Sequence, residues 1–234
     1  MRALYRMFLA SQVTRARVAG LGALGLVAVL LGVAVGAGTS ADPLSDGIGL
    51  VDTFGLSLFV PVTTLVFASA VLGEPSEDGT LVYLWLRPVA RWHLVTAALA
   101  AALTVALPTV VVPMALAAAA TGAGGMLVAA TVASCTLAAV AYGAIFLWLG
   151  LRVRRALVWG LAYILVWEGF VARAGGTAAL LAVRSHTRSL LAHLADGADQ
   201  LVEVALATAV VLPVLAAIVA VGLTVRRLTR QDVA

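Results

Sequence analysis

The chain has 234 residues, of which 63% are hydrophobic and only 11% are charged. Soluble domains carry about 25% charged residues, so this composition excludes a soluble enzyme and predicts an integral membrane protein. The apolar stretches are continuous and do not alternate with polar residues, which excludes a transmembrane β-barrel and predicts a helix bundle. All fifteen basic residues are arginines in short segments between apolar runs. Membrane orientation accounts for them better than nucleic-acid binding.

Six transmembrane helices are predicted, because about 20 apolar residues at 1.5 Å per residue cross a hydrocarbon layer of about 30 Å. Within a single domain, the predicted spans cover residues 18–38, 50–73, 94–120, 125–151, 156–170 and 201–225. Before the first span, residues 1–17 place Leu4, Phe8 and Leu9 at helical spacing among several arginines. This pattern predicts an elbow helix that lies in the membrane interface and leads into the first span.

The arginines are distributed unevenly between the two sides of these spans. Twelve of them lie in the N-terminal stretch, the connections after spans two and four, and the C-terminal tail. The other connections hold only Arg173, Arg184 and Arg188. By the positive-inside rule, we expect both termini and residues 74–93 to be cytoplasmic and residues 171–200 to be extracytoplasmic. Arginine without lysine, with abundant alanine, valine, leucine and glycine, is typical of GC-rich bacterial genomes, so we expect a multi-pass protein of a bacterial cell membrane.

Residues 171–200 are too polar to cross the membrane and too apolar to form a plain loop. The apolar stretches TAALLAV and SLLAHLA flank a polar stretch over residues 184–188. We expect two short helices at the outer interface, between spans five and six. The sequence leaves open whether these helices dip into the bilayer.

The connection between spans two and three carries the motif GEPSEDGTLVYLWLRPVARWH. Glu77 and Asp78 bring negative charge to the start of a predicted helix over residues 79–86, where the helix dipole favours it. Arg87 closes this helix and Pro88 stops it. The pattern predicts a short, capped cytoplasmic helix along the membrane surface, which a second protein can grip.

This segment resembles the coupling region of the type-2 permeases of ATP-binding cassette (ABC) transporters. The family pattern is an acid, Gly-Thr-Leu, a short apolar helix and Pro-Val-x-Arg. The matching residues here are Glu74, Glu77, Asp78, Gly79, Thr80, Leu81, Arg87, Pro88 and Arg91. The elbow helix, six spans and short outer helices fit the layout of that family. The resemblance implies that residues 74–93 form a coupling helix that docks into a groove on a cytoplasmic ATPase, with Trp85 on its apolar face.

The resemblance also implies a function, that of a non-catalytic membrane subunit. With a second permease subunit, identical or different, it would form the translocation path. ATP and magnesium would bind to the partner ATPase and no cofactor to this chain, because the chain has no GxxxxGK[ST] motif. The family exports lipids, drugs and polysaccharides among other molecules, so the resemblance implies export of a lipid, a drug or another amphipathic substrate.

Other function classes make different demands on the sequence. The main alternative is an ion- or proton-coupled secondary transporter or a channel. Such proteins carry ionisable residues near the middle of several spans, whereas spans one, three, four and six have none there. A membrane enzyme needs a nucleophile and a base or a metal pair, and no HExxH or GxSxG motif is present. The simplest structural alternative is that residues 74–93 form only a capped interfacial helix.

Glu168 is the one acid that lies next to an apolar span without a polar loop around it. It follows Ala156 by about 18 Å of helix, which puts it in the outer half of the membrane. A charge at the membrane centre costs at least about 2.5–3.5 kcal/mol, so Glu168 should face the bundle interior, the interface or a partner such as Arg173. It either marks the outer end of span five or lines the translocation path or its gate.

Span one is rich in glycine, and Gly32 and Gly36 have the GxxxG spacing of close helix contacts. They predict tight packing against another helix of the same subunit or against a second subunit. The single cysteine, Cys135, excludes an internal disulfide and a cysteine-based metal site. No other residues suggest a ligand set, so we expect no metal site.

Overall fold

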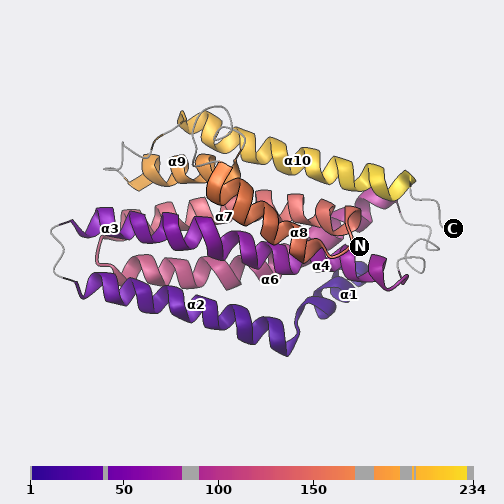
Figure 1. Ribbon diagram of the computed structural model, residues 1–234, viewed down its shortest axis with the longest axis horizontal. Helices are drawn as coiled ribbons and strands as arrows, with labels where there is room; N and C mark the ends of the chain where they lie inside the picture. The colour runs from indigo at the N-terminus through magenta and orange to yellow at the C-terminus, as the bar shows by residue number, and fades with distance from the viewer. Residues whose placement is uncertain are drawn as a thin grey trace.

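The computed structural model describes residues 2–38, 42–80, 90–171, 182–195, 202 and 204–230. All regular structure in these residues is helical, and five of their helices are long and apolar enough to cross a membrane. These properties confirm a multi-pass, all-α membrane protein. Figure 1 shows the long helices as a bundle of roughly parallel rods. In chain order, with η for π-helical segments, the helices are α1 (Arg2–Gln12), α2 (Arg15–Gly36), α3 (Pro43–Leu50), η1 (Val51–Phe59), α4 (Val60–Glu77), α6 (Arg91–Ala120), α7 (Gly125–Arg152), α8 (Ala156–Ala162), η2 (Tyr163–Val171), α9 (Val183–Ala195) and α10 (Leu206–Arg230).

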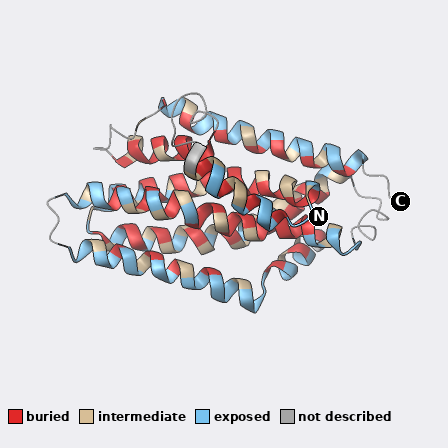
Figure 2. Ribbon diagram, viewed as in Figure 1, coloured by how far each residue is buried: buried red, intermediate tan, exposed pale blue. Residues whose placement is uncertain are grey.

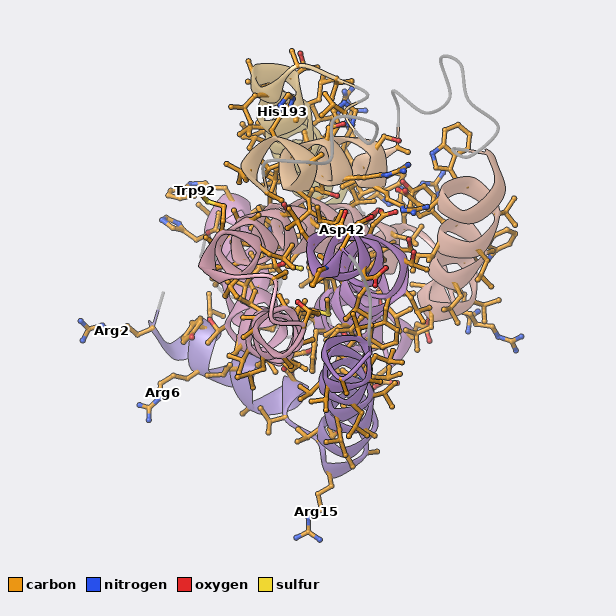
Figure 3. The ribbon with its side chains drawn as sticks, turned by 90° about the vertical axis from the view of Figure 1, so that its left-hand side faces the viewer. Arg2, Arg6, Arg15, Asp42, Trp92 and His193 are labelled. Carbon is orange, nitrogen blue, oxygen red and sulfur yellow. The ribbon has the colours of Figure 1, made fainter. Side chains whose placement is uncertain are left out.

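α1 is an amphipathic helix at one end of the bundle, here called the α1 end; the opposite end is the α3 end (Figure 1). Leu4 and Phe8 are buried where α1 packs on α6. Arg2 and Arg6 are exposed and point away from the bundle (Figure 3). α1 therefore falls within the residues for which an elbow helix is expected. The end of α4, the turn between α7 and α8, and the end of α10 lie at the same α1 end.

The second expected span, residues 50–73, is longer than predicted at both ends. α3, η1 and α4 continue one another as one apolar helix, Pro43–Glu77, whose middle part is π-helical. Proline suits the first turn of this helix, where its missing N–H would have no partner in any case. At the other end α4 runs on past Gly73, because this glycine lets α4 pack closely against the backbone of Gly150 in α7.

The last two expected spans differ from the prediction. α8 and η2 occupy the expected fifth span, residues 156–170, but the apolar helix Ala156–Gly169 is shorter than the five candidate spans. Six spans are thus expected and five such helices are found among the described residues. α10 begins at Leu206 and continues to Arg230, about one turn later than predicted at each end. Arginines in the last turn of a helix are favoured by its dipole, which suits this extension.

α9 is a polar helix that is almost completely buried (Figure 2). It packs alongside α7 and α10 and does not lie flat across the end of the bundle. Arg184 is 8% exposed, His186 3% and Thr187 0%. α9 falls on the second of the two stretches, within residues 171–200, where short outer helices are expected. The other falls mostly on residues 172–181, which lie outside the described residues.

α2 packs against α6 through small residues. A side chain added at Gly32 or Gly36 would collide with the backbone of Ala117 or Ala120 in α6. The GxxxG spacing therefore serves a close contact inside this subunit. In contrast, α2, α8 and α10 expose large apolar side chains on their outer faces (Figure 2). Such faces suit the lipid of a membrane or another membrane helix.

Candidate functional site

A buried group of ionised side chains lies in the half of the bundle nearer α3. Arg184 of α9 binds Asp52 of η1 with two hydrogen bonds: Nη2 donates to Oδ2 at 2.8 Å and Nε to Oδ1 at 3.3 Å. Arg188, one turn further along α9, places its Nε 3.5 Å from the same Oδ2. The side chains of Asp52 and Arg184 are only 10% and 9% exposed. Asp52 therefore holds two arginines of α9 against the long helix that contains η1.

Glu168 belongs to η2 and lies against the N-terminus of the same helix α9. Its Oε1 accepts a hydrogen bond from the hydroxyl of Tyr163 at 3.1 Å, and its Oε2 accepts one from the backbone N–H of Arg184 at 3.4 Å. The hydroxyl of Tyr142, from α7, faces the same carboxylate without a hydrogen bond of normal geometry. Glu168 is 1% exposed. Its charge is therefore stabilised by a phenol and by the N-terminus of α9, where the helix dipole favours an anion.

Asp52, Glu168, Arg184 and Arg188 form what we call the buried ion cluster. Two acids and two arginines balance their formal charges. This balance is needed because an unpaired ion costs several kcal/mol when it leaves water. Its members come from three elements that are far apart in sequence, so the cluster fixes α9 against both η1 and η2.

Both acids of the buried ion cluster lie in π-helical segments. Asp52 is in the first turn of η1, and Glu168 is in η2. π-Helical turns are rare and occur frequently at functional sites, because they shift side chains out of the regular helical register. Two such segments at one cluster mark it as a candidate functional site.

A second set of polar contacts lies at the α1 end, at the base of the expected coupling segment. Glu74 forms an ion pair with Arg17, which is in the first turn of α2. The Oε1 of Glu77 accepts a hydrogen bond from the backbone N–H of Arg155 at 2.7 Å. Arg155 has a left-handed backbone, with φ at 58°, in the short turn between α7 and α8. A non-glycine residue rarely adopts this conformation, and the Glu77 carboxylate satisfies its amide.

Glu77 and Asp78, which we expected at the start of a helix, lie at the end of another one. Glu77 is the last residue of α4, and Asp78 caps its C-terminus with a backbone hydrogen bond to Glu74. α4 extends this far because its packing on α7 continues and because Glu74 and Glu77 find partners on neighbouring helices. Gly79 then has φ at 69°, the left-handed conformation that commonly follows a helix end.

The rest of the predicted coupling residues are only partly described. The hydroxyl of Thr80 donates to the carbonyl of Pro75 at 3.4 Å. Arg91 begins α6. The remaining predicted coupling residues lie outside the described residues; they are Leu81, Trp85, Arg87 and Pro88. The base of the segment is thus defined, and the predicted helix over residues 79–86 stays a prediction.

No protein-family model matches this chain, and no curated protein is found to be similar to it. Its function must therefore be argued from its residues and their arrangement.

Glu168 is the one member of the buried ion cluster that the sequence singled out. The expected partner, Arg173, lies outside the described residues, and the partner found is the backbone of Arg184. Asp52, Arg184 and Arg188 were not predicted as site residues. The available signal was an acid inside an apolar run, together with two arginines one helical turn apart.

The buried ion cluster predicts the effect of removing one carboxylate. Asp52→Asn leaves the buried Arg184 and the partly exposed Arg188 with Glu168 as the one acid of the cluster, and breaking a buried pair costs about 3–5 kcal/mol. We expect Asp52→Asn to lower the free energy of unfolding by about that amount, measured by denaturant unfolding of the purified protein in detergent. Asp46→Asn is the control, because Asp46 is exposed at the same end of the long helix. Equal stability of the two variants would contradict a structural role for the cluster.

Proposed function

We propose that this chain is the membrane permease subunit of an ABC transporter, with both termini and residues 74–93 on the cytoplasmic side of a bacterial cell membrane. The observation that carries the proposal is the pair of contacts at the base of the coupling segment. Glu74 joins the segment to α2, and Glu77 joins it to the turn before α8. A protein that binds the segment therefore acts on two further helices as well as on α4 and α6.

The two acids of the buried ion cluster lie on the helices that these contacts join. Pro43–Glu77 carries Asp52 near one end and Glu77 at the other. The α8–η2 helix starts next to Arg155 and carries Glu168 about 18 Å further along. A displacement of the coupling segment is therefore passed along rigid helices to the buried ion cluster, which we propose to be the gate of the translocation path.

The proposal assigns each partner a place. ATP and magnesium bind to a soluble ABC ATPase, which drives the transport. A second permease subunit, identical or different, packs against one of the apolar faces on α2, α8 or α10. Lipids cover the remaining apolar faces. The apolar surroundings of the path suit export of a lipid, a drug or another amphipathic substrate.

A second candidate function is ion- or proton-coupled transport. The observation that favours it is the burial of Glu168 among polar groups, since buried carboxylates often mark ion and proton paths in membranes. In this case transport would proceed without an ATPase and would depend on an ion gradient.

The proposed orientation predicts which residues react from outside the cell. In a Cys135→Ala background, a cysteine at Ser45 should react with a membrane-impermeant thiol reagent in intact cells. A cysteine at Ser76 should react only after the membrane is permeabilised. The two positions lie near opposite ends of the same long helix, so each serves as the control for the other. The reverse labelling pattern would overturn the orientation.

The coupling role predicts that single substitutions in residues 74–93 release the ATPase. Asp78→Arg places a repulsive charge at the interface, and Trp85→Ala removes an apolar anchor, which at an interface centre costs about 2 kcal/mol or more. As a mere helix-end residue, Asp78 would change the stability by only about 0.3–1 kcal/mol. We expect both variants to reach the membrane in normal amounts and to lose co-purification with the ATPase.

Asp46→Arg is the matched control for Asp78→Arg, because it reverses an exposed acid near the opposite end of the same helix. It should keep the ATPase. If Asp78→Arg and Trp85→Ala also keep it, the segment is only a capped helix and the permease proposal loses its main support.

The gate role predicts a transport defect for Glu168→Gln. Glutamine keeps the size of the side chain and one acceptor oxygen, which can accept from Tyr163 or from the amide of Arg184 but not replace both carboxylate oxygens. The variant loses the negative charge, whose interaction free energy is about that of one charge-assisted hydrogen bond. We therefore expect the transport rate to fall about tenfold. Membrane abundance and ATPase binding should equal those of Asp46→Asn. Unchanged transport would reduce Glu168 to a structural role.

A further inference from the structure

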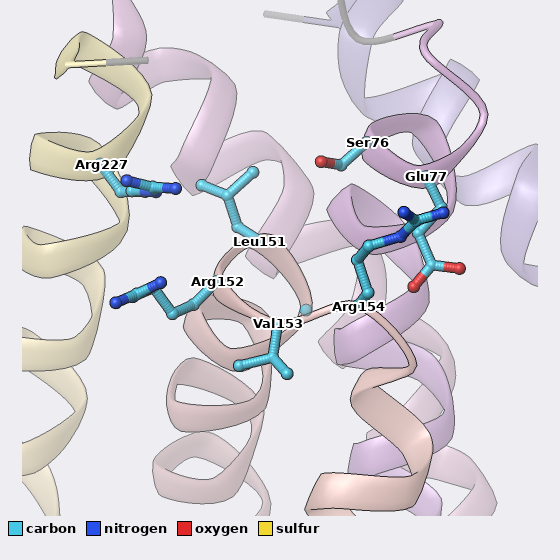
Figure 4. A pocket seen from close by; sticks show the side chains of 8 residues that line it. Ser76, Glu77, Leu151, Arg152, Val153, Arg154 and Arg227 are labelled. Carbon is cyan, nitrogen blue, oxygen red and sulfur yellow. The ribbon is translucent and has the colours of Figure 1, made fainter.

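A hollow with a volume of about 400 Å³ opens at the α1 end, between the ends of α4, α7 and α10. Three arginines line it. Arg152 is the last residue of α7, Arg154 lies just after it, and Arg227 lies in α10. Figure 4 shows Arg152 and Arg227 on one side of Leu151 and Val153, with Arg154 and Ser76 on the other. These side chains line one hollow, with Leu151 and Val153 between the two groups.

The charges in this arginine pocket are not balanced by nearby acids. Within the described residues, none of the three arginines forms an ion pair. Glu77 also lines the pocket, so three arginines stand against one carboxylate among its lining residues. The pocket therefore keeps a net positive charge and offers guanidinium donors that match the oxygens of a phosphate.

A second hollow, of about 340 Å³, shares the lining residue Glu77 with the arginine pocket. It follows α4 from Glu77 back to Ser69, a distance of about 12 Å at 1.5 Å per residue, and faces the start of α8. Ala70, Leu157 and Val158 line this groove. A basic pocket at a helix end therefore adjoins an apolar groove that runs into the membrane part of the bundle.

We propose that the arginine pocket and the groove together bind one anionic phospholipid of the cytoplasmic leaflet. The phosphodiester lies among Arg152, Arg154 and Arg227, and the first part of an acyl chain lies along α4 and α8. Basic pockets between membrane helices on the cytoplasmic side suit anionic head groups. The cytoplasmic position of this site rests on the proposed orientation, whereas lipid binding itself needs no ATPase.

The groove distinguishes a lipid from other anions. A soluble phosphate or an acidic loop of a partner protein would satisfy the arginines but leave the apolar groove empty. An amphipathic ligand can fill both hollows at once. Its charged head group would occupy the arginine pocket, and the apolar chain joined to it would occupy the groove.

The experiment measures lipid retention by the purified full chain. After delipidation in detergent, the protein is mixed with equal amounts of phosphatidylglycerol and phosphatidylcholine that have identical acyl chains, and the bound lipids are counted by native mass spectrometry. We expect several-fold enrichment of phosphatidylglycerol on the wild type. Arg152→Gln with Arg227→Gln should abolish the enrichment, since each arginine near an anionic head group contributes about fivefold.

Arg226→Gln with Arg230→Gln is the matched control, because it removes two exposed arginines of α10 that do not line the pocket. This control should keep the enrichment. Equal loss in both double variants would show diffuse attraction to surface charge and overturn the site. Enrichment that survives in the pocket variant would overturn it as well.

Two further arms test the groove. Val158→Trp fills it, whereas Val166→Trp adds the same side chain at an exposed position of η2 outside it. We expect only Val158→Trp to reduce retention of phosphatidylglycerol. Inorganic phosphate at about 10 mM should not compete with the lipid. Displacement by phosphate, or equal retention in the two tryptophan variants, would contradict a lipid in the groove.

Discussion

The pairing of buried ions is the constraint on which much of this structure depends. An ionised side chain inside an apolar bundle must find an opposite charge or several hydrogen-bond donors, because its desolvation costs several kcal/mol. Arg184 meets this demand through Asp52, which Arg188 also contacts, when α9 lies against η1. Glu168 meets it at the N-terminus of the same helix. The burial of α9, a helix too polar to enter a membrane alone, follows from these contacts.

Polar contacts tie the Pro43–Glu77 helix and the α8–η2 helix together at both ends. At the α1 end, Glu77 of α4 holds the amide of Arg155, directly before α8. In the other half of the bundle, Asp52 and Glu168 are joined through Arg184, whose side chain binds one acid and whose amide binds the other. The Pro43–Glu77 helix and the α8–η2 helix therefore form a frame closed by polar contacts. Within such a frame, a shift at one end changes the geometry at the other.

The sequence predicted the long helices well, because continuous apolar runs and flanking arginines are local signals. Residues 94–120 and 125–151, for example, became Arg91–Ala120 and Gly125–Arg152. The failures concern long-range contacts. Asp52 and Arg184 are 132 residues apart, so neither residue alone indicates the pair. α4 runs four residues past Gly73, the expected end of span two, for a similar reason: it packs on Gly150 and finds partners on α2 and in the turn before α8.

The contacts of the buried ion cluster are stronger than those at the α1 end. In the proposed transporter, this difference would determine where a conformational change begins. The Asp52–Arg184 pair is nearly inaccessible to water, so separating it costs several kcal/mol. In the Arg17–Glu74 pair, the side chain of Glu74 is 52% exposed, and exposed pairs contribute only about 0.2–1 kcal/mol. A partner at the α1 end can therefore replace the contacts of Glu74 at little cost, while the buried ion cluster holds. In the proposed transporter, the cluster would open only after α4 and α8 have moved apart enough for water to reach it, so opening would follow binding at the proposed coupling segment.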